Sequence, residues 1–271
     1  LLGNVIPSID ALLLSGDLAF AGDPAEYARV RPVLESLAGA AGINLRRVYA
    51  VPGNHDVERR RHGDRNLRRM LQVLRMGVEE VDEVLSNPVD RELLLSRFQG
   101  FRQLARALAL AALDEEEDAL QAWSLPMAAR AGLAVRIVGL NTALLCMDDD
   151  DQGRLRLPPA LLERRTGLAA SRPDELVIAL SHHPLHADWL ADQGALRAWL
   201  QGRVHVNLCG HNHEGDLRDL RAGGGQGVIH VATGGDPREG GKIGQGYNLA
   251  AVVQTAEGLV LRVWPRRYSE R

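Results

Sequence analysis

Four short clusters of polar residues along the chain have side chains that can bind metal ions. The clusters are Ser15-Gly16-Asp17, residues 52–56, Ser181-His182-His183-Pro184 and residues 210–213. Each cluster begins where an apolar run with strand character ends. Because loops at the carboxyl ends of neighbouring strands converge, we expect the four clusters to face one point.

The residue types in these clusters favour a metal centre with hydrolytic chemistry. Aspartate, asparagine and histidine form a mixed oxygen and imidazole set that suits manganese, iron(II) or zinc. Two ions about 3.5 to 4 Å apart, bridged by a carboxylate, can polarise a phosphoryl oxygen and generate hydroxide near neutral pH. Glycines beside most of these residues allow the sharp turns that such loops need.

Taken singly, two of the clusters also have ordinary structural interpretations. A Gly-Asp pair after a strand is a common turn, and His182-His183-Pro184 can be a turn with one packed histidine. Residues 53–56 and 210–213 are more specific, because Asn-His-Asp and His-x-His place several coordinating groups on short loops. The occurrence of all four clusters in one chain favours the metal interpretation.

In this order the clusters resemble the signature of the calcineurin-like metallophosphoesterase family, in its bacterial form. Its blocks G-D, G-N-H-[DE], His-His-Pro and G-H-x-H are matched by Gly16-Asp17, residues 53–56, residues 182–184 and residues 210–213. Residues 139–157 also resemble bacterial members. The resemblance implies an α/β fold, an αββα sandwich of two mixed β-sheets flanked by helices. It also implies two divalent metal ions, such as manganese, iron or zinc.

The resemblance further implies which residues hold these two ions. Asp17 would bridge both ions, and Asn54, His182 and His211 would complete the shell of the second ion. His213 would belong to the first ion.

The same resemblance implies a catalytic pair beside the metal ligands. His55 would contact the phosphoryl group without binding metal, and would stabilise charge or protonate the leaving oxygen. Asp56 would orient His55 as its hydrogen-bonding partner. Of the two adjacent histidines in the third block, we take His182 as the ligand and His183 as its neighbour.

One block of the family signature, D-x-H, is absent. The first histidine of the chain is His55, and Asp10 is followed by Ala11 and Leu12. In the family this block ends the first strand and supplies two ligands to one ion. Only 16 residues precede Asp17. We therefore expect the sequence to lack its natural N-terminal strand.

Hydrophobic patterning predicts alternating strands and helices within a single domain spanning residues 1–271. Helices are expected at residues 25–41, 158–170 and 190–201. The last strands follow one another without a helix and predict an antiparallel end to the sheet. Strands are expected at residues 11–15, 47–51, 133–140, 176–181, 203–209, 228–233, 247–254 and 259–264.

Residues 58–123 depart from this alternation and predict a helical insertion that could cap the site. Long helices are expected at residues 66–85 and 90–113. The insertion opens with a strongly basic run at residues 58–65. This run is either a solvated helix start or a clamp for a substrate phosphate.

Composition limits the classes of partner. The chain of 271 residues is 45% hydrophobic and 25% charged, as is ordinary for a soluble globular protein. Its net charge of −3 gives no bulk attraction to nucleic acid or membrane. Cys146 and Cys209 lie in apolar stretches, so neither a disulfide framework nor a cysteine zinc site is expected. We therefore expect a cytoplasmic protein that does not enter the membrane.

Three functions are compatible with these features. The first is hydrolysis of phosphodiesters or phosphomonoesters by metal-bound hydroxide, with a small phosphate ester or nucleotide as substrate. The second is a non-catalytic regulatory or interaction module that kept the fold and lost one metal site. The third is a nuclease, which the mild acidity and the 4% aromatic content disfavour.

Overall fold

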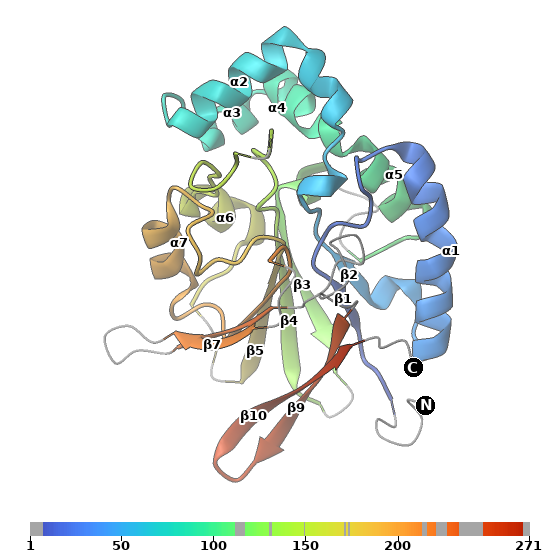
Figure 1. The fold of residues 1–271 in the computed structure, drawn as a ribbon. Helices are drawn as coiled ribbons and strands as arrows, with labels where there is room; N and C mark the ends of the chain where they lie inside the picture. The colour runs from blue at the N-terminus through green and yellow to red at the C-terminus, as the bar shows by residue number, and fades with distance from the viewer. Residues whose placement is uncertain are drawn as a thin grey trace.

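The structure is a computed structural model that describes residues 8–111, 117–129, 132–148, 150–170, 172, 174–212, 216–220, 227–232 and 246–267. Strands occupy the middle of the molecule and helices lie on both sides of them (Figure 1). This arrangement confirms the expected α/β fold.

The largest sheet in the described residues has six strands and is mixed. Its four central strands are parallel to one another, and its two edge strands run antiparallel to their neighbours. In spatial order the strands are β3 (Ala122–Ala128), β4 (Ala134–Leu140), β5 (Glu175–Ser181), β6 (Val206–Cys209), β8 (Val228–Ala232) and β7 (Asp216–Leu220).

Two further strand pairs accompany this sheet. β1 (Leu12–Leu14) and β2 (Val48–Ala50) are parallel, and Tyr49 of β2 stacks on Trp123 of β3 with ring centroids 6.0 Å apart. β9 (Gly246–Thr255) and β10 (Gly258–Arg267) form an antiparallel hairpin. Hydrogen bonds therefore divide the described strands into one sheet of six and two pairs, where two mixed sheets were expected.

The helices form three groups around the strands (Figure 1). One group, α1 and α5, packs together on one side of the strands, and a second group, α6 and α7, lies on the opposite side. The third group, α2 to α4, lies beyond the end of the sheet. The helices are α1 (Pro24–Ala41), α2 (Arg65–Met76), α3 (Val81–Ser86), α4 (Pro88–Leu95), α5 (Gln99–Ala107), α6 (Pro159–Thr166) and α7 (Gln193–Leu200).

Local signals fix where these helices begin and end. Asp23 and Glu26 form a capping box at the start of α1, and Gly42 ends it in the left-handed conformation at φ 66°. Gly77, at φ 69°, likewise ends α2 well before the expected residue 85. Short 3-10 turns occur at Leu45–Arg47, Asn54–Asp56, Arg59–Gly63, Ser96–Phe98 and Glu117–Leu120.

The second long helix, expected at residues 90–113, is also divided. A 3-10 turn at Ser96–Phe98 separates α4 from α5. In this turn the fully buried Arg97 donates hydrogen bonds to the carbonyls of Leu94, Leu144 and Cys146. The turn therefore aims a buried cation at the loop that follows β4.

Two edge strands were not predicted. β3 contains Pro126, which lacks an N–H and is tolerated because this strand has a neighbour on one side only. β7 reads Asp-Leu-Arg-Asp-Leu, and its charged residues hide the strand signal. The eight strands that the sequence predicted are all present. Among the described residues, no helix has the length and apolar character needed to cross a bilayer.

Candidate metal centre

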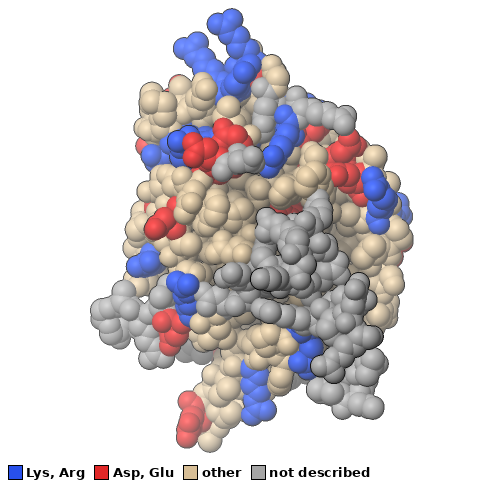
Figure 2. Space-filling model, viewed as in Figure 1, with Lys and Arg blue, Asp and Glu red and all other residues tan. Residues whose placement is uncertain are grey.

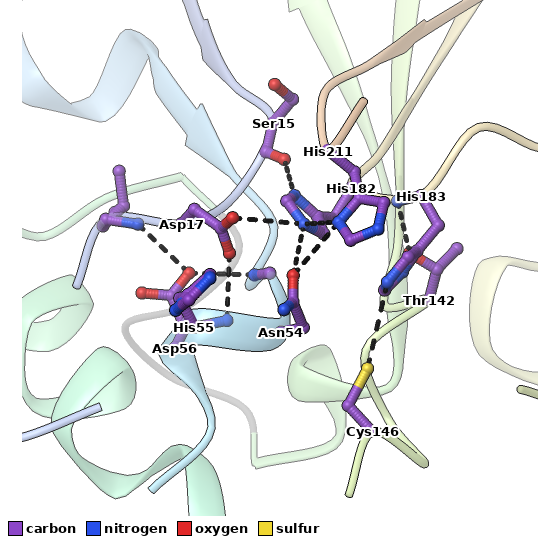
Figure 3. Close-up of polar contacts among 12 residues, drawn as sticks. Ser15, Asp17, Asn54, His55, Asp56, Thr142, Cys146, His182, His183 and His211 are labelled. Carbon is purple, nitrogen blue, oxygen red and sulfur yellow. Dashed lines mark hydrogen bonds and ion pairs between the residues drawn. The ribbon is translucent and has the colours of Figure 1, made fainter. Parts of the chain in front are cut away.

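Four loops meet at the carboxyl ends of β1, β2, β5 and β6, as the sequence predicts. They bring together Asp17, Asn54, His182 and His211, whose side chains point toward one another (Figure 3). The centre of the group is Nε2 of His182. It lies 2.9 Å from Oδ1 of Asn54, 3.1 Å from Nδ1 of His211 and 3.4 Å from Oδ2 of Asp17.

The backbone is strained at two of these four positions. Asp17 has φ 56° and His211 has φ 69°, in the left-handed region that side chains other than glycine seldom adopt. Such strain concentrates at functional sites, where the surrounding structure enforces it. The adjacent glycines are needed for close approach: a Cβ atom on Gly53 would lie 2.1 Å from Oδ1 of Asp17, and one on Gly16 would lie 2.7 Å from Nδ1 of His182.

The donor set fits a divalent cation. Nδ1 of His182 lies 2.8 Å from the Ser15 carbonyl, which can only accept, so this nitrogen carries the proton and Nε2 of a neutral ring has a lone pair. That lone pair faces a carboxylate oxygen, an amide oxygen and another imidazole nitrogen. Ligands about 2.1 Å from an octahedral ion lie about 3 Å from one another, which is close to the spacing of these atoms.

His183 lies beside this group but is engaged elsewhere. One imidazole nitrogen from each of His182, His183 and His211 lies within 4.8 Å of the other two, which is the spacing of a metal-binding cluster. The Thr142 hydroxyl, however, accepts from the backbone N–H of His183 at 2.9 Å and lies 3.0 Å from its Nδ1. Nε2 faces Sγ of Cys146 at 3.9 Å. Burial lowers the pKa of His183 well below its usual value. These contacts favour His182 over His183 as the ligand.

His213, the expected ligand of the first ion, lies outside the described residues. The described residues therefore supply a convergent shell for one ion. Oδ2 of Asp17 faces His182 in this shell. The other carboxylate oxygen of Asp17, Oδ1, lies on the far side from His182 and accepts from the backbone N–H of His55 at 3.0 Å.

The prediction that Asp56 orients His55 through a hydrogen bond is wrong. Nδ1 of His55 instead lies 2.7 Å from the Phe20 carbonyl, and the imidazole stacks on the Phe20 ring with centroids 5.3 Å apart. Asp56 is buried and points toward the loop that follows β1. Both side chains instead bond neighbouring residues of the loop that follows β1, His55 at the Phe20 carbonyl and Asp56 at the Ala19 N–H.

Asp56 joins the loops after β1 and β2. One carboxylate oxygen accepts from the backbone N–H of Ala19 at 3.0 Å and from the Tyr27 hydroxyl at 2.9 Å. The other accepts from the N–H groups of Gly53 at 2.8 Å and Leu18 at 3.3 Å. Burial raises the pKa of Asp56 to about 6, against the opposing effect of these hydrogen bonds. Asp56 is thus a positioning residue for both loops.

The basic run at residues 58–65 has two different environments. Arg61 pairs with Glu58 at 2.8 Å and donates to Gln99 at 2.8 Å, as a structural arginine would. Arg59 lines a narrow hollow next to Asn54. The rest of this hollow is lined by Val57, Cys146, Met147, Asp148 and Asp151. Within the run, Arg59 therefore lies beside a proposed metal ligand, Asn54.

Several residues of this centre carried no clear signal in the sequence. Phe20 and Tyr27 contact His55 and Asp56 from segments with no recognisable motif. Trp189 packs edge-on against His211, with ring centroids 4.2 Å apart. Thr142 could have been found, because it lies two residues after an expected strand, as members of the ligand loops do.

Comparison with known proteins gave one family. The family model described as calcineurin-like phosphoesterase matches residues 2–215, which include all four polar clusters. No curated protein sequence matched the chain. The family match confirms the resemblance inferred from the cluster motifs.

Proposed function

The chain belongs to the calcineurin-like phosphoesterase family, and from that premise we propose that it hydrolyses phosphate esters at a centre of two divalent ions. The observation that carries the proposal is the convergence of Asp17, Asn54 and His211 on Nε2 of His182. Both phosphodiesters and phosphomonoesters fit this chemistry, and the substrate class is a small phosphate ester or a nucleotide.

In this proposal Asp17 would contribute to both ions, Asn54, His182 and His211 would hold one of them, and His213 would help to hold the other. Bound divalent ions would supply positive charge that polarises the phosphoryl group and lowers the pKa of a water molecule. The protein holds the ligands rigidly in advance, because Ser15 fixes the His182 ring and Asp56 fixes the loops of Asp17 and Asn54. Such pre-organisation avoids a cost of reorganisation during the reaction.

His55 acts on the ester oxygens from beside the ions. The Phe20 carbonyl accepts from Nδ1, which leaves Nε2 as the nitrogen that exchanges a proton with substrate. The stacked Phe20 ring and the hydrogen bond to Asp17 fix the position of the imidazole and of its backbone. His55 can therefore stabilise charge on a phosphoryl oxygen or protonate the leaving oxygen.

The helical layer of α2 to α4 caps the substrate site in this proposal. Figure 2 shows arginine side chains projecting from the end of the molecule where Figure 1 places these helices, and α2 carries the exposed Arg65, Arg68 and Arg69. Arg59, next to the proposed ligand Asn54, is the arginine of the basic run that we expect to contact a substrate phosphate. Residues 58–123 would thus select the substrate.

The proposal extends to the ion and the compartment. Oxygen and imidazole ligands without thiolate suit manganese, which we propose as an effective ion. Cys146 and Cys209 are both buried and form no disulfide, which supports a reducing compartment such as the cytoplasm.

The test is hydrolysis of a generic phosphodiester and a generic phosphomonoester by the full-length protein with added Mn²⁺. We expect Asp17→Asn and His55→Ala to lower kcat/KM by about 100- to 1,000-fold for the preferred ester. Asp174→Asn is the matched control, because Asp174 is exposed and precedes β5 at the end opposite the ligand loops. The proposal is wrong if the wild type hydrolyses neither ester, or if the two variants are as active as the control.

A further inference from the structure

A buried ion pair joins helix α2 to the loop that follows β4. Nη1 of Arg75, on α2, lies 3.1 Å from Oδ1 of Asp151, and the two side chains are only 6% and 7% exposed. Nη2 of Arg75 also donates to the carbonyl of Asp150 at 2.8 Å and lies 3.4 Å from Oδ1 of Asp148. One guanidinium group of α2 therefore binds three residues of this loop.

The buried Asp151 carboxylate fixes the backbone of the loop from within. Its Oδ1 accepts from the backbone N–H of Met147 at 3.0 Å and from that of Asp148 at 3.4 Å. Burial raises the pKa of Asp151, and both the hydrogen bonds and the charge of Arg75 oppose this rise. Arg75 therefore helps to keep Asp151 in the ionised form that accepts from these two N–H groups.

A second arginine of the helical layer holds the same loop. Arg97, in the turn that follows α4, is fully buried and donates to the carbonyls of Leu144 and Cys146. Its remaining acceptor is the carbonyl of Leu94 in α4, at 3.1 Å. Arg75 and Arg97 therefore attach the loop after β4 to the helical layer at two points.

The loop held in this way contacts the histidines of the candidate metal centre. Sγ of Cys146 lies 3.9 Å from Nε2 of His183, and the Thr142 hydroxyl accepts from the backbone N–H of His183 at 2.9 Å (Figure 3). The His183 ring packs against those of His182 and His211, with centroids 4.8 and 4.4 Å away. The position of the loop therefore limits where two of the proposed ligands can lie.

We propose that Arg75 is a positioning residue of the metal centre, which acts through Asp151 and the loop that follows β4. The inference rests on the proposed function and deepens it, because it names a residue of the helical layer on which the geometry of the ligands depends. Contacts behind metal ligands orient them, and removing such a contact commonly weakens metal binding by about 10- to 100-fold. A buried ion pair contributes little net stability, because the desolvation of both charges offsets their attraction. The pair therefore serves the geometry of the loop more than the stability of the fold.

The first test measures whether Arg75 holds the loop. Cys146 and Cys209 are the two cysteines of the chain, and both are buried. In a Cys209→Ser background, the reaction of Cys146 with a chromogenic disulfide reagent reports opening of the loop. We expect Arg75→Met to raise the rate of this reaction in metal-free protein by about 10-fold. Arg136→Met is the matched control, because Arg136 pairs with Glu175 at 3.0 Å toward the opposite ends of β4 and β5. An unchanged rate in Arg75→Met overturns the inference.

The second test measures Mn²⁺ affinity by calorimetry, with the full-length protein and no substrate. We expect the dissociation constant of Mn²⁺ to rise about 10-fold in Arg75→Met and to stay within about 2-fold of the wild type in Arg136→Met. Arg75→Lys keeps a cation beside Asp151 and should retain most of the affinity. A general loss of stability would weaken binding in Arg75→Met and Arg136→Met alike, so an equal rise in these two variants overturns the inference.

A double variant serves if Arg75→Met alone leaves the protein unfolded, because Asp151 would then be buried without its partner. Arg75→Met combined with Asp151→Asn removes both charges and retains an amide oxygen for the Met147 N–H. We expect the same loss of Mn²⁺ affinity in this variant. Weaker Mn²⁺ binding supports the inference even if no phosphate ester is hydrolysed, in which case the proposed function alone fails. Wild-type affinity in these variants overturns the inference even if esters are hydrolysed.

Discussion

The two halves of the candidate metal centre are held in place by different means. Asp17, Asn54 and His55 follow β1 and β2, and we call them the carboxylate half. The buried Asp56 carboxylate accepts hydrogen bonds from N–H groups of both of these loops. The histidine half comprises His182, His183 and His211, which follow β5 and β6. There the rings pack against one another and are oriented by single contacts, such as that of His182 with the Ser15 carbonyl.

The loops of the carboxylate half therefore depend on one side chain, whereas the histidine half depends on several. A single carboxylate with four donors supports the carboxylate half. The histidine half is supported by a series of separate contacts: Ser181 donates to the His183 carbonyl, Asn207 donates to Ser181, and His230 contacts Asn207 at 3.0 Å. We therefore expect substitutions behind the ligands to have unequal effects, although the ligands themselves matter equally.

Removing a ligand from the histidine half should have the largest effect and should match the loss of Asp17. We expect His182→Ala to lower kcat/KM by about 1,000-fold, which corresponds to about 4 kcal/mol of transition-state stabilisation, because the ring is at the centre of the shell. Metal content after dialysis against Mn²⁺ should fall in parallel. The adjacent His183→Ala provides the comparison, and equal retention of metal by both variants would contradict the ligand assignment.

In the carboxylate half, Asp56→Asn should cause the largest loss of stability. An asparagine has one acceptor oxygen, and its NH₂ group would face N–H donors that now bind a carboxylate oxygen. We expect the free energy of unfolding to fall by about 3 to 4 kcal/mol, measured by urea denaturation without metal. Asp174→Asn is the control for loss of an exposed carboxylate. A loss below about 1 kcal/mol would show that this half is supported as diffusely as the other.

The histidine half should have its own dependence on pH, through His230. Burial, with His186, Arg197 and Arg218 nearby, lowers the pKa of His230 from 6.5 to about 4. The unfolded chain therefore binds this proton between pH 6.5 and 4 while the folded protein does not. The free energy of unfolding should fall as pH is lowered through this range, by about 3 kcal/mol at pH 4 from this residue.

The matched measurement is urea unfolding of the wild type and His230→Gln at several pH values. A glutamine cannot take up the proton, so the difference between the two proteins should change by about 3 kcal/mol between pH 7 and pH 4. Contributions from other titrating groups cancel in this difference. A constant difference across the range would mean that His230 titrates alike in the folded and unfolded chain.

The sequence could predict which polar side chains converge, because these residues lie in local signatures. Asp17, Asn54 and His211 each follow a glycine at the end of a strand, and this glycine is what the turn requires. The supporting contacts could not be predicted in the same way. Tyr27 donates to Asp56 across 29 positions, and Phe20 reaches His55 across 35. Such contacts depend on how α1 and the loops pack, which no local pattern specifies.

The fold shows the same distinction. The central strands β4, β5 and β8 read as continuous apolar runs and were predicted within one residue of their bounds, whereas β6 begins three residues later than expected. The edge strands β3 and β7 were missed, because an edge position tolerates Pro126 and charged residues that a central strand would not. The helical insertion expected at residues 58–123 and its role as a cap stay predictions. A cap is defined by how substrate enters the site, which the positions of the helices alone do not determine.

The smallest effect should come from a single supporting contact of the histidine half. Thr142→Val keeps the shape of the side chain and removes the hydroxyl that contacts both Nδ1 and the backbone N–H of His183. We expect a loss of about 1 to 2 kcal/mol in the free energy of unfolding, because a buried N–H loses its acceptor while the neighbouring rings still pack. Since His182 is fixed separately by Ser15, kcat/KM should change less than in any ligand variant. A Thr142→Val loss as large as that of Asp56→Asn would remove the contrast between the two halves, because one hydroxyl would then support the histidines as strongly as one carboxylate supports the opposite loops.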